Sequence, residues 1–230
     1  MDLTRRAALR AAVATAGAGA MVLATPGGAL AAYPTLRRGS TGSAVRTLQS
    51  RLSDLRYWCG TVDGVFGGLT EQAVLALQKA AGISRDGIVG PATWSRLSAG
   101  VRPSVRTRSG TWVEVDKARQ LFLHVVDGRL TMALNTSTGS GQRYWSRGAW
   151  HVAVTPSGSY RVYRKVDGWD DGPLGSLWRP AYFNGGIALH GYGSVPAYPA
   201  SHGCVRVSLS AMDMLRRLGR VPVGRRVTVY

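Results

Sequence analysis

The spacing of apolar residues changes near residue 100, and this change constrains the fold more than any other feature of the chain. Between residues 37 and 97 they recur every three or four positions, as in amphipathic helices; after residue 110 they alternate, as in strands. Apolar residues make up 45% of the 230-residue chain, which excludes disorder throughout. We therefore expect a small all-α domain and a mostly-β domain, joined by an aperiodic linker over residues 98–109.

The helical segment contains an internal repeat. Residues 44–49 (Ala-Val-Arg-Thr-Leu-Gln) return at residues 73–78 as Ala-Val-Leu-Ala-Leu-Gln, and each copy is paired with an Asp-Gly turn, at residues 63–64 and 86–87. The pattern predicts three short helices on one core, close to the size limit for independent folding. Their expected boundaries are caps at Ser43 and Thr70, a stop at Gly82 and a third start near Pro91.

The second half of the chain begins with a strong hairpin signal. Alternating apolar residues flank the Asp127-Gly128 turn, which predicts paired strands over about 121–134. Apolar residues spaced along about 209–219 predict one helix. Further short strands are expected at 151–154, 160–166, 186–190, 204–208 and 225–230. The second half of the chain is therefore predicted to be mostly β.

Residues 1–31 have the composition of an export signal. Arg5 and Arg6 precede a weakly apolar run over residues 11–24, and Ala29-Leu30-Ala31 is typical of a cleavage site. The run is too short to span a bilayer, so no transmembrane segment is expected. The arginine pair resembles a twin-arginine signal, which implies export to the cell wall or medium. The alternative is a basic N-terminal helix of a cytosolic protein.

The chain is strongly basic, with 29 Lys and Arg against 12 Asp and Glu and a formal net charge of +17. This charge favours an acidic neighbour, such as an anionic wall polymer, over a neutral one. Nucleic acid is the other standard partner, but the basic residues are scattered and no aromatic ladder accompanies them. A generally solvated basic surface explains the charge equally well, and no nucleic-acid partner is expected.

A thiol and two imidazoles are close together in the sequence near residue 200. His190 ends an apolar run, and His202 and Cys204 lie in the segment Ser-His-Gly-Cys-Val-Arg at 201–206. A neighbouring imidazole can take the proton of a thiol and create the thiolate nucleophile. Gly203 would let backbone N–H groups approach an oxyanion, and Arg206 adds positive charge. His124 and His151, which lack polar company, are expected to be packing or surface residues.

Two other uses of the same side chains stay open. His190, His202 and Cys204 have the ligand types of a zinc site, although their spacing matches no common pattern. Cys59 and Cys204, the only cysteines, could instead form one disulfide. No Ser-x-x-Lys, Gly-x-Ser-x-Gly, His-Glu-x-x-His or Cys-x-x-Cys motif is present, which excludes several other hydrolase and transferase designs.

Both halves resemble known families. Residues 37–97, with their repeated Asp-Gly turns and Thr-Trp near the end, resemble the peptidoglycan-binding domain of wall enzymes. Residues 110–230 resemble the YkuD-type L,D-transpeptidase domain through His190-Gly191, the motif at 201–206, Thr155-Pro156-Ser157-Gly158 and the final strand. The interval from His190 to Ser201 is shorter than in many members, and Arg206 stands where some members carry Asn.

The transpeptidase resemblance implies a role for each motif residue. Cys204 would be the nucleophile and His190 the proton donor and acceptor, oriented by the carbonyl of Gly191. His202, Gly203 and Cys204 would form the oxyanion site, with Ser201 supporting the turn. Arg206 would hold a substrate carboxylate. No cofactor and no metal are implied.

Together these features predict an exported, wall-bound cysteine transpeptidase. Its substrates would be tetrapeptide stems of peptidoglycan as donor and acceptor, joined in a 3→3 cross-link with release of the terminal D-Ala. A carboxypeptidase or hydrolase on the same scaffold is the first alternative. A catalytically inactive wall-binding protein is the second, and a nucleic-acid binder is the third.

Overall fold

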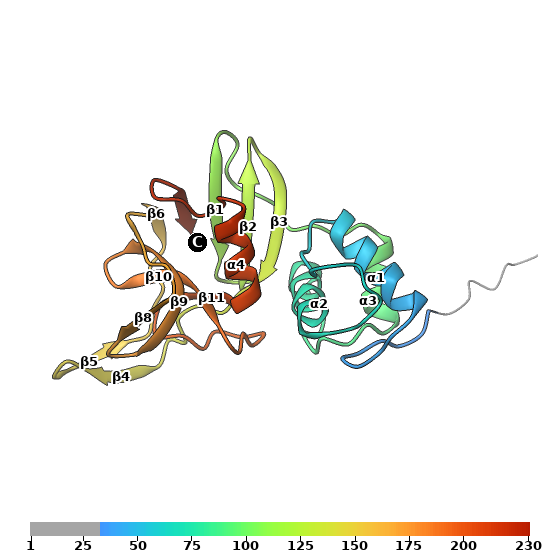
Figure 1. The fold of residues 1–230 in the computed structure, drawn as a ribbon, viewed down its shortest axis with the longest axis horizontal. Coiled ribbons are helices and arrows are strands. Elements are labelled where there is room, and N and C mark those ends of the chain that lie inside the picture. Colours follow the sequence, from blue (N-terminus) through green and yellow to red (C-terminus); the bar gives the residue numbers. More distant parts are fainter. Residues whose placement is uncertain (1–32) are drawn as a thin grey trace, which may run out of the picture. The chain divides into compact units, whose positions relative to one another are not determined.

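A computed structural model describes residues 33–230, which form one compact unit (Figure 1). The predicted export signal over residues 1–31 lies outside the described residues. Three helices come first in the described part of the chain, as expected for the all-α domain: α1 (Ser43–Asp54), α2 (Gly68–Ala81) and α3 (Pro91–Ser98). No helix within residues 33–230 is long and apolar enough to cross a membrane.

The internal repeat corresponds to a repeated hydrogen-bond arrangement. The Gln49 amide donates to the Asp63 carboxylate over 2.8 Å and accepts from the N–H of Gly64, also over 2.8 Å. Gln78 binds the second turn, at residues 86–87, in the same way over 2.7 and 2.9 Å. Each glutamine thus satisfies the polar groups of one Asp-Gly turn, which explains why glutamine and turn recur together.

The predicted N-caps Ser43 and Thr70 are wrong, although α1 does begin at Ser43. The N-cap positions are Gly42 and Gly67, and neither helix has a side-chain cap. Thr70 lies inside α2, where its buried hydroxyl accepts from the Gln49 amide over 3.1 Å. The predicted boundaries at Gly82, which is left-handed with φ 64°, and at Pro91, the first residue of α3, are confirmed.

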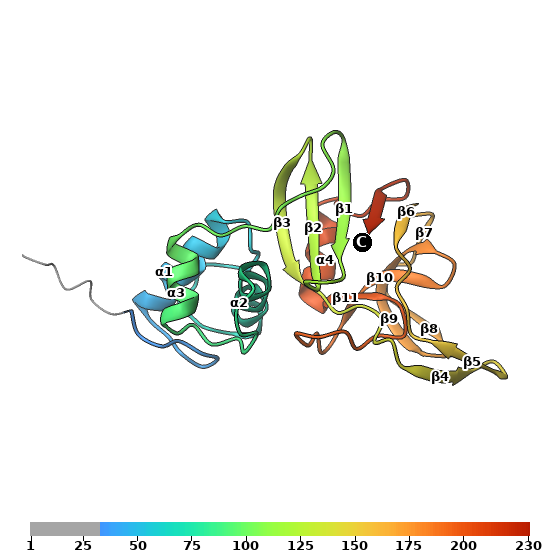
Figure 2. The same cartoon turned by 180° about the vertical axis from the view of Figure 1, so that it is seen from behind.

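The rest of the described chain is mostly β, as predicted. The first sheet has the order β3-β2-β1-β12-β6, and the second has β11-β10-β9-β7, with β8 also on β9. β4 and β5 pair as a separate two-stranded ribbon (Figure 2). The strands are β1 (Thr111–Asp116), β2 (Leu121–Val126), β3 (Arg129–Asn135), β4 (Arg143–Ser146), β5 (Ala149–Val152), β6 (Gly158–Arg161), β7 (Arg164–Lys165), β8 (Trp169–Gly172), β9 (Gly175–Asn184), β10 (Ile187–Tyr192), β11 (Val205–Ser208) and β12 (Arg226–Val229).

The predicted hairpin over residues 121–134 is confirmed as β2 and β3, in which Phe122 pairs with Leu134. The predicted helix near 209–219 is confirmed as α4 (Leu209–Arg217), capped by the Ser208 side chain. The strand expected at 160–166 is divided into β6 and β7. Four strands, β1, β4, β8 and β9, were not predicted.

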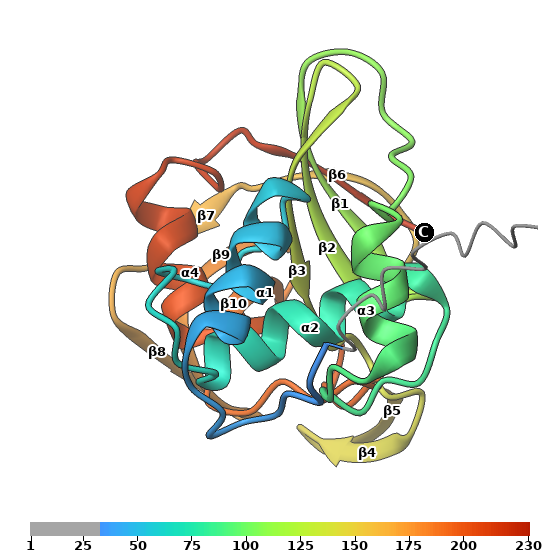
Figure 3. The same cartoon turned by 90° about the vertical axis from the view of Figure 1, so that its right-hand side faces the viewer.

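Strand β2 contributes to two hydrophobic cores. Phe122 packs into the core between the two sheets and α4, whereas Leu121, Leu123 and Val125 pack with the apolar faces of α1, α2 and α3. Figure 3 shows the three helices in front of the first sheet, to which β2 belongs. Ala133 of β3 also belongs to the helical core, and its N–H donates to the Arg56 carbonyl over 2.7 Å. The two halves therefore share buried apolar surface.

Candidate active site

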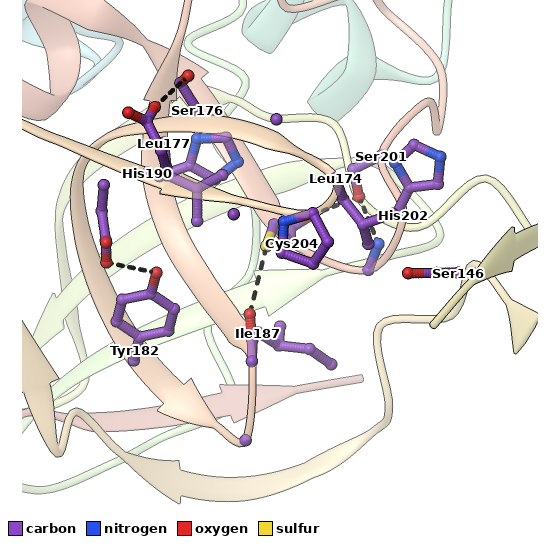
Figure 4. Close-up of a pocket in the computed structure, with 18 of the residues that line it drawn as sticks. Ser146, Leu174, Ser176, Leu177, Tyr182, Ile187, His190, Ser201, His202 and Cys204 are labelled. Carbon is purple, nitrogen blue, oxygen red and sulfur yellow. Dashed lines mark hydrogen bonds between the residues drawn. The ribbon is translucent and has the colours of Figure 1, made fainter. Parts of the chain in front are cut away.

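Neighbouring parallel strands bring the two parts of the motif together. His190 in β10 pairs in register with Arg206 in β11. Cys204 directly precedes β11, so its side chain is held close to the start of β10, beside Ala188. Figure 4 shows Cys204, His190 and His202 around the same pocket. Sheet topology, rather than closeness in sequence, thus joins the imidazole and the thiol.

A tight turn over residues 201–204 presents the thiol. The Ser201 hydroxyl donates to the Cys204 carbonyl over 2.6 Å and accepts from the Gly203 N–H over 3.0 Å. Gly203 has φ 139°, and a Cβ there would lie 2.8 Å from the Val154 carbonyl oxygen. The Thr155 hydroxyl donates to the Gly203 carbonyl over 2.6 Å. Only glycine fits this backbone conformation without strain.

The backbone of the turn offers two free donors. Because the Gly203 N–H donates to Ser201, it does not point at a ligand as expected for an oxyanion donor. The N–H groups of His202 and Cys204 have no hydrogen-bond acceptor within residues 33–230. Gly203 therefore shapes the turn, and its two neighbours leave donors available.

The Cys204 thiol is mostly enclosed. Its sulfur lies 3.5 Å from the N–H of Ala188, which donates to it, and 3.9 Å from the carbonyl oxygen of Gly186. Burial raises the pKa of the Cys204 thiol, while the Ala188 N–H and the Arg206 charge act in the opposite direction. At neutral pH the resting sulfur is therefore a protonated thiol that needs a base.

The imidazole of His190 is buried and oriented. Its Nδ1 donates to the Gly191 carbonyl over 2.9 Å, so Nε2 is the free acceptor nitrogen. Burial lowers the pKa of His190 to about 4; the Gly191 hydrogen bond raises it and the Arg206 charge lowers it. A Cβ on Gly191 would lie 2.7 Å from Trp178 and 3.2 Å from the Leu209 Cα. Close packing on Gly191 thus keeps the imidazole in place.

Six of the seven predicted site residues line one cleft of about 550 Å³: His190, Ser201, His202, Gly203, Cys204 and Arg206. Gly191 lies behind His190 and does not line it. The Arg206 guanidinium stacks 4.0 Å from the Tyr192 ring centroid and donates to the Ala200 carbonyl over 3.0 Å. Its Nε is buried without a hydrogen-bond partner. Arg206 lines the cleft and forms no ion pair within residues 33–230, so its charge is not neutralised there.

Two walls of the cleft were missed by the sequence interpretation. The β4–β5 hairpin contributes Tyr144, Ser146, Arg147 and His151, and the Tyr144 ring contacts the His202 ring edge-on at 4.7 Å. Strands β8 and β9 and their turn contribute a second wall that includes Asp170, Asp171, Leu174 and Tyr182. The alternation of Tyr144 and Ser146 with exposed Trp145 is the sequence signal that could have revealed the first wall.

The remaining candidate groups are accounted for separately. Cys59 and Cys204 are both free, so the alternative disulfide is not formed. Within residues 33–230 no group of three His, Cys, Asp or Glu side chains is arranged to hold a metal ion. His124 is buried in β2 with its Nδ1 2.6 Å from the Thr131 hydroxyl, as a packing residue. His151 is exposed on β5, at the rim of the cleft.

Two family profiles match the chain. The profile described as "Putative peptidoglycan binding domain" matches residues 41–97, and the one described as "L,D-transpeptidase catalytic domain" (YkuD) matches residues 110–229. The second covers more than half of the chain, so this protein belongs to the YkuD family of L,D-transpeptidases. Both resemblances drawn from the sequence are confirmed.

A crystal structure of the L,D-transpeptidase from Xylanimonas cellulosilytica is 49% identical, with a TM-score of 0.83; the match covers 86% of this chain and 98% of that one. Among curated proteins, a probable N-acetylmuramoyl-L-alanine amidase of Bacillus licheniformis is 34% identical over 50% of this chain and 32% of its own length. The zinc D-Ala-D-Ala carboxypeptidase of Streptomyces albus G is 44% identical over 27% of this chain and 26% of its own. The chain thus spans less than a third of the length of either curated relative.

Proposed function

We propose that this protein is a cell-wall L,D-transpeptidase that forms 3→3 peptidoglycan cross-links through a thioester on Cys204. The observation that carries the proposal is the shared cleft of Cys204, His190 and Arg206, in a chain of the YkuD family that also carries a peptidoglycan-binding segment. A nucleophile, a base and a cation around one cavity are the groups that acyl transfer from a carboxylate-bearing peptide requires.

In the first half-reaction, the Cys204 sulfur attacks the carbonyl carbon of the third, diamino residue of a donor tetrapeptide. His190 takes the thiol proton on Nε2, the nitrogen that the Gly191 hydrogen bond leaves free. The N–H groups of His202 and Cys204 stabilise the oxyanion, in the turn that Gly203 and Ser201 hold. The bond to the terminal D-Ala breaks, and D-Ala leaves with the proton from His190.

In the second half-reaction, the side-chain amine of the diamino residue in a neighbouring stem attacks the thioester. The new amide forms, the carbon–sulfur bond breaks, and the proton lost by the amine returns to the sulfur through His190. Arg206 holds a substrate carboxylate, because it lines the cleft and no carboxylate within residues 33–230 neutralises its charge. If water replaces the amine, the same steps give an L,D-carboxypeptidase. The described residues of the cleft have no feature that favours water over an amine.

The cellular location of the protein and the roles of its four segments belong to the same proposal. Residues 1–31 act as a twin-arginine export signal, residues 37–97 bind the wall, residues 98–109 connect, and residues 110–230 catalyse. Wall binding raises the local concentration of stems around the cleft. The excess of basic residues adds attraction to anionic wall polymers, and this attraction should weaken with salt. Binding by the 37–97 segment should persist at high salt in sedimentation with purified sacculi.

Intact-mass spectrometry tests the chemistry. The mature protein is mixed with a soluble tetrapeptide in the absence of acceptor, and the reaction is quenched rapidly. The Cys204-containing peptide should then carry an adduct with the mass of the tripeptide acyl group. Hydroxylamine should remove the adduct, as expected for a thioester. An adduct on another residue would contradict the proposal. Turnover by both wild type and the Cys204→Ser variant, with an adduct in neither, would also contradict it.

A further inference from the structure

One face of α2 contacts the catalytic half through two polar side chains, Gln72 and Lys79. They are seven residues apart and therefore lie on the same side of the helix, which faces β3 (Figure 1). Both reach Asn135 at the end of β3, and Gln72 also reaches the segment over residues 193–200. That segment connects β10, which carries His190, to the Ser201 turn.

Lys79 is completely buried, with 0% of its surface exposed. Its ammonium donates to the carbonyls of Gln120 and Thr136, each over 3.0 Å, and to the side-chain oxygen of Asn135. These acceptors use all three of its donor positions, and all belong to the catalytic half. Within residues 33–230 no carboxylate forms an ion pair with it. Burying an amine is costly, and burial lowers the pKa of Lys79 to about 7.

Asn135 links the helix to the segment over residues 193–200. Its amide donates to the Gln72 side-chain oxygen over 2.6 Å and to the Val195 carbonyl over 3.0 Å. Gln72 donates to the same Val195 carbonyl over 3.2 Å. Arg85 adds a contact over 3.4 Å to the carbonyl of Ala197. The helical bundle therefore fixes the outer side of this segment at two points.

The inner side of the same segment is fixed by the residues that follow β3. The Ser137 hydroxyl donates to the Tyr198 carbonyl over 2.8 Å, and the N–H groups of Ala200 and Ser201 both donate to Thr138 over 3.0 Å. Residues 193–200 are thus held between α2 and the chain after β3. The Ser201 turn, which presents Cys204, begins where this support ends.

The Lys79 contacts also continue to Arg206. Thr136, whose carbonyl accepts from Lys79, donates its hydroxyl to the Arg206 carbonyl over 2.6 Å. Ser137 exchanges backbone hydrogen bonds with Arg206 over 2.9 and 3.2 Å. One residue therefore separates the buried ammonium from the strand that carries the proposed carboxylate-binding side chain.

We propose that Gln72 and Lys79 are positioning residues for the transpeptidase site, so that the peptidoglycan-binding bundle is a structural part of the catalytic apparatus as well as a tether. They act by fixing residues 193–200 and the start of β11, and through them the Ser201–Cys204 turn. The turnover measurements below rest on the proposed function; the exchange and alkylation measurements do not.

The test compares two glutamines of α2 in the full chain. Gln72→Ala removes two hydrogen bonds to the catalytic half, whereas Gln78→Ala removes four hydrogen bonds that lie inside the bundle. Lys79→Met is a third variant. Circular dichroism and melting curves set a temperature at which every variant is folded. Readouts are turnover of a soluble tetrapeptide, hydrogen exchange of residues 193–201, and the rate of Cys204 alkylation by iodoacetamide.

Gln72→Ala should lower kcat about tenfold with KM within about twofold, because a displaced nucleophile costs rate rather than binding. It should also speed exchange in residues 193–201 and change the Cys204 alkylation rate, whereas Gln78→Ala should lower the melting temperature and leave all three readouts near wild type. Equal losses in both glutamine variants, or wild-type readouts in folded Gln72→Ala, would overturn the proposal. If wild type does not turn over tetrapeptide, the proposed function fails, and exchange and alkylation alone decide this inference.

Discussion

At the scale of residues, the two proposed catalytic groups are both held in their neutral forms. Burial raises the pKa of Cys204 and lowers that of His190 to about 4. A preformed thiolate–imidazolium pair is therefore not the resting state, and proton transfer accompanies attack. Cys59 is also buried, beside the Ser53 hydroxyl at 3.4 Å, and burial raises its pKa with no imidazole in contact. Only one of the two thiols thus has a base to activate it.

The two cysteines should respond differently to substitution. Cys204→Ala should lower turnover by at least about a thousandfold, because no other group can carry the acyl chain. Cys59→Ser should keep turnover within about threefold and lower only stability, since Cys59 packs in the helical core. Steady-state kinetics with matched melting curves would check this. The double variant Cys204→Ala/His190→Ala should be scarcely worse than Cys204→Ala alone, and additive losses would argue against a coupled pair.

The pKa of His190 determines the acid side of the pH profile. The imidazole must be neutral to accept the thiol proton, so kcat/KM should fall as pH decreases through about 4, not through the ordinary value near 6.5. Arg206 lowers this pKa through its positive charge, so Arg206→Gln should move the acid limb to higher pH as well as raise KM. A limb that stays in place in Arg206→Gln, or one near 6.5 in wild type, would contradict the account.

At the scale of elements, the turn over residues 201–204 and strand β10 position the site through glycines without space for a side chain. Gly203 has both a positive φ and a close contact to the Val154 carbonyl. Gly193, three residues after His190, has neither. The two glycines therefore form a matched pair for substitution.

Gly203→Ala should lower kcat about a hundredfold, because the added Cβ displaces the turn that carries the thiol and its backbone donors. Gly193→Ala should leave kcat within about twofold. Crystal structures or hydrogen exchange of the turn, together with kinetics, would check the pair. Equal activity in both variants would mean that the turn tolerates the shift and does not depend on glycine at position 203.

The sequence predicted the elements whose patterns are simple and missed those in which polar residues are buried. Strand β1 was not predicted, because the polar residues Glu114 and Asp116 are buried inside it. Glu114 accepts hydrogen bonds from the N–H groups of Arg106 and Thr107 and from the Tyr230 hydroxyl. β9 contains Pro180 and a left-handed Arg179, which conceal its length. In contrast, the motif that contains His190 and Cys204 lies on two adjacent strands, and both residues line one cleft; their catalytic roles stay a prediction.

At the scale of the whole molecule, residues 33–230 combine a wall-binding bundle and a transferase that share a core. The near-continuous apolar run of β2 was a usable signal, because a strand buried on both faces loses its alternation. That run predicted a hairpin, and the burial of both faces of β2 was not predicted. The polar contacts of Gln72 and Lys79 could not be predicted, since they depend on the docking of α2 against β3.

The buried histidines should make the folded protein sensitive to acid. Burial lowers the pKa of His124 to about 4, so between about pH 6.5 and 4 the unfolded chain binds a proton that the folded chain does not, and stability falls as pH decreases. His124→Gln removes this titration. Between pH 7 and 4.5 its melting temperature should therefore gain about 5–10 °C relative to wild type. A constant difference across that range would show that His124 does not contribute.

The most direct test of the central claim is the structure of the product. The mature protein is incubated with tetrapeptide-containing sacculi, which are then digested and analysed by tandem mass spectrometry for the linkage in muropeptide dimers, with Cys204→Ala as control. The account predicts dimers joined between two third-position diamino residues, together with released D-Ala, in wild type and neither in the variant. Tripeptide monomers without such dimers would contradict cross-linking and establish the carboxypeptidase alternative, and dimers formed equally by Cys204→Ala would contradict the nucleophile.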